Sequence, residues 1–193
     1  MAQISTALAQ GKLLVAREGL QDPNFSRTVV LLLNYSESGA SGVVLNRPSP
    51  FRLEQLLPDL EWSSRVEEPV YLGGPVAVTR ALMLFATARN HAEGSPVVGA
   101  VHVGWDLEFL ERMVTDPQEN DKFRIFAGHA GWAAGQLEAE VGRRGWYVFP
   151  ATGADIFSDG EEQLWETFIR KTRARIAGLQ PRSPERESPT PCE

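Results

Sequence analysis

The 193-residue sequence contains a single cysteine, Cys192, and no apolar run long enough to cross a membrane. One cysteine excludes an intrachain disulfide and a zinc site built from several cysteines, and this usage is typical of a reducing compartment. The densest apolar run, Val29–Leu33, is far shorter than the roughly 18 residues of a membrane-spanning helix. The first eight residues also lack the basic start and longer apolar stretch of a signal peptide. We therefore expect a cytoplasmic protein that makes no contact with a membrane.

Basic residues are also in deficit, because 19 Lys and Arg stand against 25 Asp and Glu, for a net charge of −6. Proteins that wrap the phosphate backbone usually present a basic surface, so this balance disfavours direct nucleic-acid binding. The length favours one domain with a core of its own. We expect this domain over residues 1–179. Residues 180–193, which offer no apolar face, are expected to form a disordered polar tail.

Imidazole is scarce, since the sequence holds only His91, His102 and His129. Their spacing fits neither a helical pair of metal ligands nor a zinc-finger pattern. No Gly-x-Ser-x-Gly sequence follows a predicted strand, and Cys192 has no fixed histidine beside it to activate the thiol. The sequence therefore predicts no metal and no cofactor, and it leaves any catalytic residues unknown.

What the sequence has is a series of short apolar segments separated by Gly, Pro, Asn or Ser, which is typical of strands. The strands are expected at Lys12–Ala16, Thr28–Leu33, Gly42–Leu45, Val70–Leu72, Ala81–Ala86, Val97–Val103, Phe123–Phe126 and Trp146–Phe149. They are not separated by regularly alternating helices, which favours antiparallel pairing over a doubly wound parallel sheet. The predicted class is α+β, as a single compact domain with a largely antiparallel or mixed sheet and helices packed outside.

Helical periodicity is clearest near the end of the chain, where Ser158 and Glu161 form a capping-box pattern before the apolar positions Trp165 and Phe168. Gly178 is expected to end that helix. Three shorter helices are expected over 107–114, 133–141 and 51–57.

Two polar segments flank the second and third predicted strands. Asp22, Asn24 and Arg27 belong to an Asp-Pro-Asn turn pattern, and Asn46 and Arg47 precede a proline. The plain interpretation is turn chemistry and solvated side chains. The functional interpretation is an anion clamp, in which a guanidinium group grips two oxygens of a ligand.

A third segment, residues 128–138, combines glycines with His129 and precedes a predicted helix. Gly131, Gly135 and Gln136 would bring backbone amides close to an anion, whereas the alternative is a tight strand-to-helix turn with Trp132 buried. The third segment lacks both the phosphate-loop and the dinucleotide-binding patterns. We expect the three segments to meet at one end of the sheet and to form an anion-accepting crevice.

These segments, taken in order, resemble the YqgE/AlgH family of bacterial proteins. The matching blocks are Gly11–Ala16, Leu20–Val29, Gly42–Pro48, Gly73–Val76 and Gly131–Glu138, and the resemblance runs from Gly11 to about Arg170. Two departures are Arg17-Glu18, where members often carry a proline, and Ala133-Ala134, where a proline often precedes the glycine. The resemblance implies a single α/β-type domain with a largely antiparallel sheet. Members are described as candidate transcriptional regulators or have no assigned activity, so it carries over no catalytic set.

Three functions follow as hypotheses. The leading one is a non-catalytic regulatory or binding protein whose partner is a small anion or another protein, with any effect on transcription indirect. The second is an enzyme that holds a small anionic substrate with Arg27, Asn46, Arg47, His129 and the amides of the third segment. The third is direct DNA binding through a basic strip on the final helix. That strip comprises Arg170, Lys171, Arg173 and Arg175.

Overall fold

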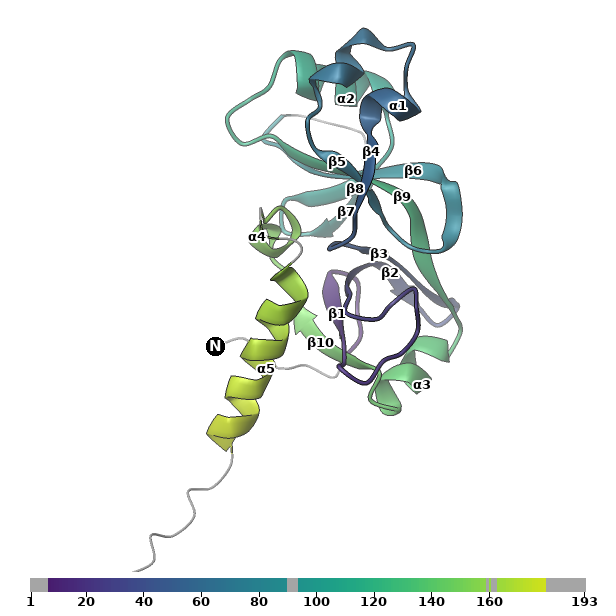
Figure 1. Cartoon of the computed structure of the whole chain (residues 1–193), viewed down its shortest axis with the longest axis vertical. Helices are drawn as coiled ribbons and strands as arrows, with labels where there is room; N and C mark the ends of the chain where they lie inside the picture. Colours follow the sequence, from purple (N-terminus) through teal and green to yellow (C-terminus); the bar gives the residue numbers. More distant parts are fainter. Residues whose placement is uncertain (1–6, 90–93, 159, 161–162, 180–193) are drawn as a thin grey trace, which may run out of the picture.

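The computed structural model describes residues 7–89, 94–158, 160 and 163–179. Within them the chain folds into a curled sheet with helices on its outside (Figure 1). The strands are β1 (Lys12–Ala16), β2 (Val29–Ser36), β3 (Gly39–Val44), β4 (Pro48–Arg52), β5 (Pro69–Leu72), β6 (Val76–Ala86), β7 (Ser95–Val98), β8 (Val101–Gly104), β9 (Lys122–Ala133) and β10 (Trp146–Pro150). The helices are α1 (Leu53–Leu56), η1 (Glu61–Arg65, a 3₁₀ turn), α2 (Leu107–Thr115), α3 (Gln136–Gly142), α4 (Gly153–Ile156) and α5 (Leu164–Leu179).

The strands follow one another across the sheet in the order β10-β1-β2-β3-β9-β6-β8-β7, and each neighbouring pair in this order is antiparallel. The one parallel pairing described joins β5 to β9, and β4 pairs with β5 beside this path. The predicted α+β class with a largely antiparallel sheet is confirmed.

Strand β9 joins the two halves of the sheet. Residues Lys122–Ala127 pair with β6 and in part with β5, and the last four residues, Ala130–Ala133, pair with β3 (Figure 1). Each half has its own apolar core. The β9 backbone therefore holds both cores in one fixed arrangement.

The larger core lies around β1, β2 and β10. Leu13–Ala16 and Val29–Leu32 are fully buried along consecutive positions, which requires cover on both faces of these strands. Helix α5 supplies part of that cover through Trp165, Phe168 and Ile169. The smaller core lies under α1, η1 and α2. The helix predicted over 107–114 is confirmed as α2, which Asp106 caps by accepting a hydrogen bond from the Phe109 amide at 2.7 Å. Its buried positions are Phe109, Leu110 and Met113, whereas Leu107 is exposed.

Several predicted elements differ from the structure in extent. The single strand expected at Val97–Val103 is a hairpin of β7 and β8, because Gly99 adopts a left-handed φ of 57° and turns the chain. The helix expected over 51–57 is only the four-residue α1, and Phe51 belongs to β4. Helix α5 continues through Gly178 to Leu179. The capping partner Glu161 and the tail 180–193 lie outside the described residues.

The glycine-rich third segment is mostly strand, because Gly128–Ala133 forms the second half of β9. The tight strand-to-helix turn is confined to Ala134 and Gly135, which join β9 to α3. A Cβ on Gly73 would clash with the Gly128 carbonyl, and one on Gly74 would clash with the His129 backbone. The glycines here let the segment between β5 and β6 cross the β9 backbone closely. The burial of Trp132, at 5% exposed, is as the turn interpretation expected.

Among the described residues, no helix is long and apolar enough to span a membrane.

Asp121, which follows α2, is held in place by three partners. Its carboxylate accepts hydrogen bonds from the Thr87 hydroxyl at 2.5 Å and the Gln118 amide at 3.1 Å, and it pairs with Arg89 at 2.9 Å. Burial on its own raises the pKa of the Asp121 carboxyl. The hydrogen bonds and the Arg89 charge outweigh burial and hold the pKa below its ordinary value.

We expect Asp121→Asn to lower the free energy of unfolding by about 1–3 kcal/mol at pH 7. Because the pKa of Asp121 is lower in the folded state, its contribution is present above the unfolded-state pKa of about 4 and disappears as the pH falls through the folded-state value. Urea unfolding of both proteins at pH 7, 5 and 3 measures this. A difference between them that stays constant down to pH 3 contradicts the assignment.

Candidate functional site

Residues 22–28 form a tight turn that binds its own backbone. The Asp22 carboxylate accepts a hydrogen bond from the Asn24 amide at 2.7 Å, and the Asp22 carbonyl accepts bonds from the amides of Phe25 and Ser26. This is the hydrogen bonding that the turn interpretation expected of an Asp-Pro-Asn sequence. Asp22 and Asn24 therefore shape the loop between β1 and β2.

Asn46 fastens this loop to the end of β3. Its side-chain oxygen accepts a hydrogen bond from the Val29 amide at 2.8 Å, and its side-chain nitrogen donates to the Arg27 carbonyl at 2.9 Å. Both ends of the amide group are thus engaged with backbone, which gives Asn46 a structural role at this position.

Arg47 binds the same loop from the other side. Its guanidinium donates to the carbonyls of Pro23, at 3.2 Å, and Ser26, at 3.3 Å. Burial lowers the pKa of Arg47, and the negative charge of Asp22 opposes this shift. The structure thus brings the first and second predicted segments together.

Arg27 points toward α5. It has a left-handed φ of 57°, forms an ion pair with Glu166, and lies over the Trp165 ring with its guanidinium carbon 4.6 Å from the ring centre. The side chain keeps 64% of its surface exposed. Arg27 therefore links the β1–β2 loop to the final helix.

The third segment meets this loop through a ring contact. Trp132 stacks against Phe25 with 5.9 Å between ring centres. His129 pairs with Val76 across β9 and β6, and Gly131 pairs with Ser41 of β3 and is exposed.

Gly135 and Gln136 begin α3. Gly135 caps the helix in a left-handed conformation, and the Gln136 side chain accepts a hydrogen bond from the Ala133 amide at 3.0 Å.

None of the nine predicted site residues lines any of the four cavities found among the described residues. That these residues share an anionic ligand stays a prediction.

Glu140 on α3 connects the third segment to β10. One carboxylate oxygen accepts hydrogen bonds from the indole N–H groups of Trp132, at 3.0 Å, and Trp146, at 2.9 Å. The other oxygen accepts a bond from the Gln136 side chain at 3.0 Å. Phe25 contacts both indole rings. This arrangement positions α3 and the turn that follows it.

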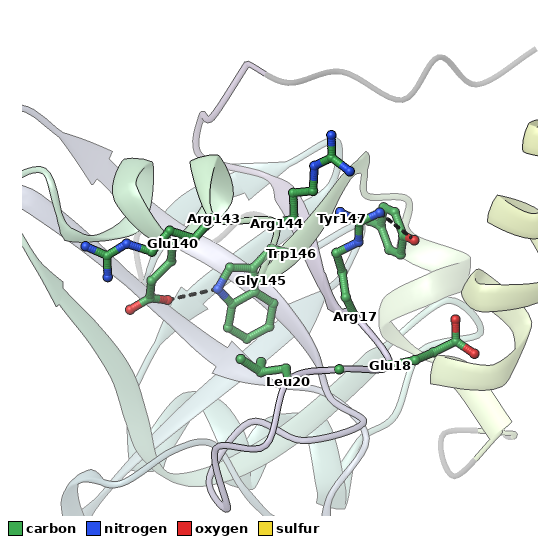
Figure 2. A pocket seen from close by; sticks show the side chains of 10 residues that line it. Arg17, Glu18, Leu20, Glu140, Arg143, Arg144, Gly145, Trp146 and Tyr147 are labelled. Carbon is green, nitrogen blue, oxygen red and sulfur yellow. Dashed lines mark hydrogen bonds between the residues drawn. The ribbon is translucent and has the colours of Figure 1, made fainter.

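That turn borders a surface cavity of about 540 Å³ (Figure 2). The cavity lies between the start of the β1–β2 loop and the α3–β10 turn, two segments far apart in sequence that antiparallel pairing of β1 with β10 brings together. The lining residues are Arg17, Glu18, Gly19, Leu20, Glu140, Arg143, Arg144, Gly145, Trp146 and Tyr147.

Arg17 is held against the Tyr147 ring. Its guanidinium carbon lies 4.1 Å from the ring centre, and one guanidinium nitrogen donates to the Tyr147 hydroxyl at 2.9 Å. The backbone is fixed as well, because the Arg17 amide donates to the Gly145 carbonyl at 3.0 Å. Figure 2 shows Arg144 on the same side of the cavity as Arg17, and Arg143 extended toward the side of Glu140.

The cavity carries positive charge that other residues leave unpaired. Among the described residues, none forms an ion pair with Arg17, Arg143 or Arg144. Of the two acidic lining residues, Glu18 pairs with Arg173 outside the cavity, and the Glu140 oxygens accept the hydrogen bonds described above. A protein with a net charge of −6 therefore presents a local site suited to an anion.

Sequence reasoning missed these arginines. Arg143 and Arg144 were not singled out, because cations after a predicted helix are common there and complement its dipole. Arg17 was noticeable only as a departure from the family pattern. The cavity forms because β1 pairs with β10, with Val15 opposite Tyr147, and no local signal reports that pairing.

Comparison with known proteins places this geometry in a family. A family model described as AlgH-like matches residues 13–177. A UPF0301 protein of Streptomyces avermitilis is 38% identical over 178 residues, which cover 86% of this chain and 88% of that protein. A UPF0301 protein of Chlorobaculum tepidum is 36% identical over 170 residues, with 84% and 86% covered.

Two solved structures share the fold. The AlgH protein from Pseudomonas aeruginosa matches with a TM-score of 0.71 and 30% identity, covering 95% of this chain and 100% of that one. A protein from Corynebacterium diphtheriae matches with a TM-score of 0.72 and 27% identity, covering 92% and 90%. The resemblance seen in the sequence is confirmed, and the chain belongs to the YqgE/AlgH family of bacterial proteins.

Proposed function

We propose that this protein is a non-catalytic binding protein of the cytoplasm that takes a small anion into the cavity lined by Arg17, Arg143 and Arg144. The observation that carries the proposal is a cavity with three arginines in its lining, of which Arg17 and Arg144 lie on the same side (Figure 2). None of the three is ion-paired with a described residue. Guanidinium groups bind carboxylate and phosphate oxygens through paired, charge-assisted hydrogen bonds. The ligand class is therefore a small phosphate or carboxylate.

The backbone at Arg144 supports this assignment. Arg144 has a left-handed φ of 62° directly after the end of α3, a position that glycine usually occupies. A residue with a Cβ at this φ carries a cost of order 1 kcal/mol. Arginine at this position lowers the stability of the fold relative to glycine. A ligand-binding role for its side chain explains why arginine stands there.

Two side chains of the enzyme hypothesis already bind the backbone of the protein itself. Asn46 binds backbone at both ends of its amide group, and Arg47 binds two carbonyls of the β1–β2 loop. A binding role in which the bound anion alters contacts with another protein fits these observations better, and any effect on transcription is then indirect.

Part of the basic strip on α5 is similarly used within the fold. Arg173 pairs with Glu18. Together with the net charge of −6, this ion pair supports indirect regulation over direct DNA binding.

Arg144→Gly is expected to weaken anion binding without lowering the stability of the fold. Binding of pyrophosphate, measured by calorimetry at low ionic strength, is expected to weaken about 10- to 100-fold because one charge-assisted contact is lost. The thermal midpoint is expected to stay the same or to rise, because glycine removes the left-handed strain. Arg17→Ala is expected to weaken pyrophosphate binding by a similar factor.

The control is Arg80→Ala, which removes an exposed arginine of β6 outside the cavity. It is expected to leave pyrophosphate binding unchanged. If Arg80→Ala weakens binding as much as Arg144→Gly, the attraction is a general charge effect and the site is wrong. A lower thermal midpoint in Arg144→Gly shows instead that Arg144 serves the fold.

A further inference from the structure

A second cavity, of about 560 Å³, lies between the end of β10 and helix α5, away from the arginine site. Its volume is within the range of roughly 300–1,000 Å³ that is typical of small-molecule sites. None of its lining residues is shared with the arginine site. A ligand here would therefore touch none of the residues that line the arginine site.

The floor of this cavity is apolar. Phe149 of β10 and Phe168 of α5 lie in contact, with 5.0 Å between their ring centres, and both are buried in the larger core. Pro150 and Ala174 are exposed and extend the apolar lining on the β10 and α5 sides. Such a surface favours a hydrocarbon over a compact polar ion.

The α5 side of the cavity adds two cations. Lys171 and Arg175 are four residues apart and therefore lie on one face of the helix. The Lys171 ammonium lies 4.5 Å from the centre of the Phe168 ring, so it borders the apolar floor directly. Within the described part of the chain, neither cation has an ion-pair partner.

The one acidic residue in the lining is Asp155, and its carboxylate is already bound. It accepts hydrogen bonds from the Thr152 amide at 3.0 Å and the Thr152 hydroxyl at 2.6 Å, which cap α4. Both bonds go to the same carboxylate oxygen, which holds Asp155 toward its own helix. Two cations, Lys171 and Arg175, stand against this one carboxylate, so the lining favours an anionic ligand.

We propose that this cavity binds a single-chain amphiphile with a carboxylate head, such as a medium-chain fatty acid. The chain covers the Phe149 and Phe168 floor, and the carboxylate binds Lys171 and Arg175. Apolar contact and charge complementarity then act on the two ends of one molecule. The site requires both parts of the ligand, which makes the proposal specific.

The test is a titration of the full chain with hexanoate, octanoate and decanoate, each below its micelle-forming concentration, followed by calorimetry. Affinity is expected to rise about two- to fourfold with each added methylene. Decylamine has the same chain and the opposite charge, and it is expected to bind at least tenfold more weakly than decanoate. Equal binding of the two, or no gain with chain length, overturns the proposal.

Variants test the two cations. The double variant Lys171→Glu and Arg175→Glu is expected to lose decanoate binding and to prefer decylamine. The matched control is Arg170→Glu on the same helix, since Arg170 is exposed and lies outside the cavity lining. An Arg170→Glu effect as large as that of the double variant overturns the site. Excess pyrophosphate, which the arginine site takes, is expected not to displace decanoate from the unaltered protein. This competition distinguishes the two cavities even if a variant fails to fold, and displacement by pyrophosphate overturns the site.

Discussion

Trp165→Ala is expected to lower the free energy of unfolding by about 3–5 kcal/mol, as truncation of a large core aromatic does. Trp165 is 7% exposed and belongs to the larger core, and its indole N–H donates to the Ala16 carbonyl at 2.7 Å. The substitution removes packing between α5 and β1 and leaves a buried carbonyl without this donor. Urea unfolding measures the loss.

Two controls separate the sources of this effect. Trp165→Phe keeps a ring in the core and removes only the indole donor, so we expect a smaller loss of about 1–2 kcal/mol. Arg170→Ala on the exposed face of the same helix is expected to change stability by less than about 0.5 kcal/mol. A midpoint for Trp165→Ala equal to that of the unaltered protein means that α5 does not stabilise the sheet.

The second large effect is expected for Glu140→Ala, which removes the acceptor shared by Trp132 and Trp146. Both indoles are buried, at 5% and 4% exposed, so their N–H groups lose a partner in a place with little access to water. An unsatisfied buried donor costs about 1–3 kcal/mol. We expect a total loss of about 2–4 kcal/mol in the free energy of unfolding, because Glu140 is itself half-buried and water replaces part of the contact.

Glu140→Gln is the matched control because it retains an oxygen that accepts from the indoles. We expect it to lose about 1 kcal/mol, since an amide accepts more weakly than a carboxylate. Indole N–H resonances of Trp132 and Trp146 in proton NMR spectra report directly on these bonds. If they keep their positions in Glu140→Ala, the shared-acceptor geometry is wrong.

Much of the fold follows from local sequence. The apolar runs at Lys12–Ala16 and near Trp146 predicted β1 and β10 almost to the residue, because buried strands need continuous apolar side chains. The apolar spacing over residues 107–114 predicted α2, since 3.6-residue periodicity is a local property. The order of the short sequence blocks from Gly11–Ala16 to Gly131–Glu138 also indicated the family, which the comparisons confirm.

The glycine-rich segment shows where local patterns are insufficient. Glycines are common in turns, and they are also required where two backbones cross closely. Only the approach of Gly73 and Gly74 to β9 distinguishes these cases, and that approach depends on residues about 55 positions away in the sequence. The sequence singled out the polar residues of the first two segments, and only the structure shows that Asn46 and Arg47 bind the β1–β2 loop.

By itself, the sequence determined most of the strands, the main helices, the α+β class and the family, because each rests on composition, periodicity or a short motif. Tertiary structure alone decided which cations gather. Arg17 and Tyr147 are 130 residues apart in the chain and in contact in the fold, and Phe149 meets Phe168 only because α5 packs beside β10. Long-range pairing of strands sets these neighbours, and a single sequence carries no local signal of that pairing.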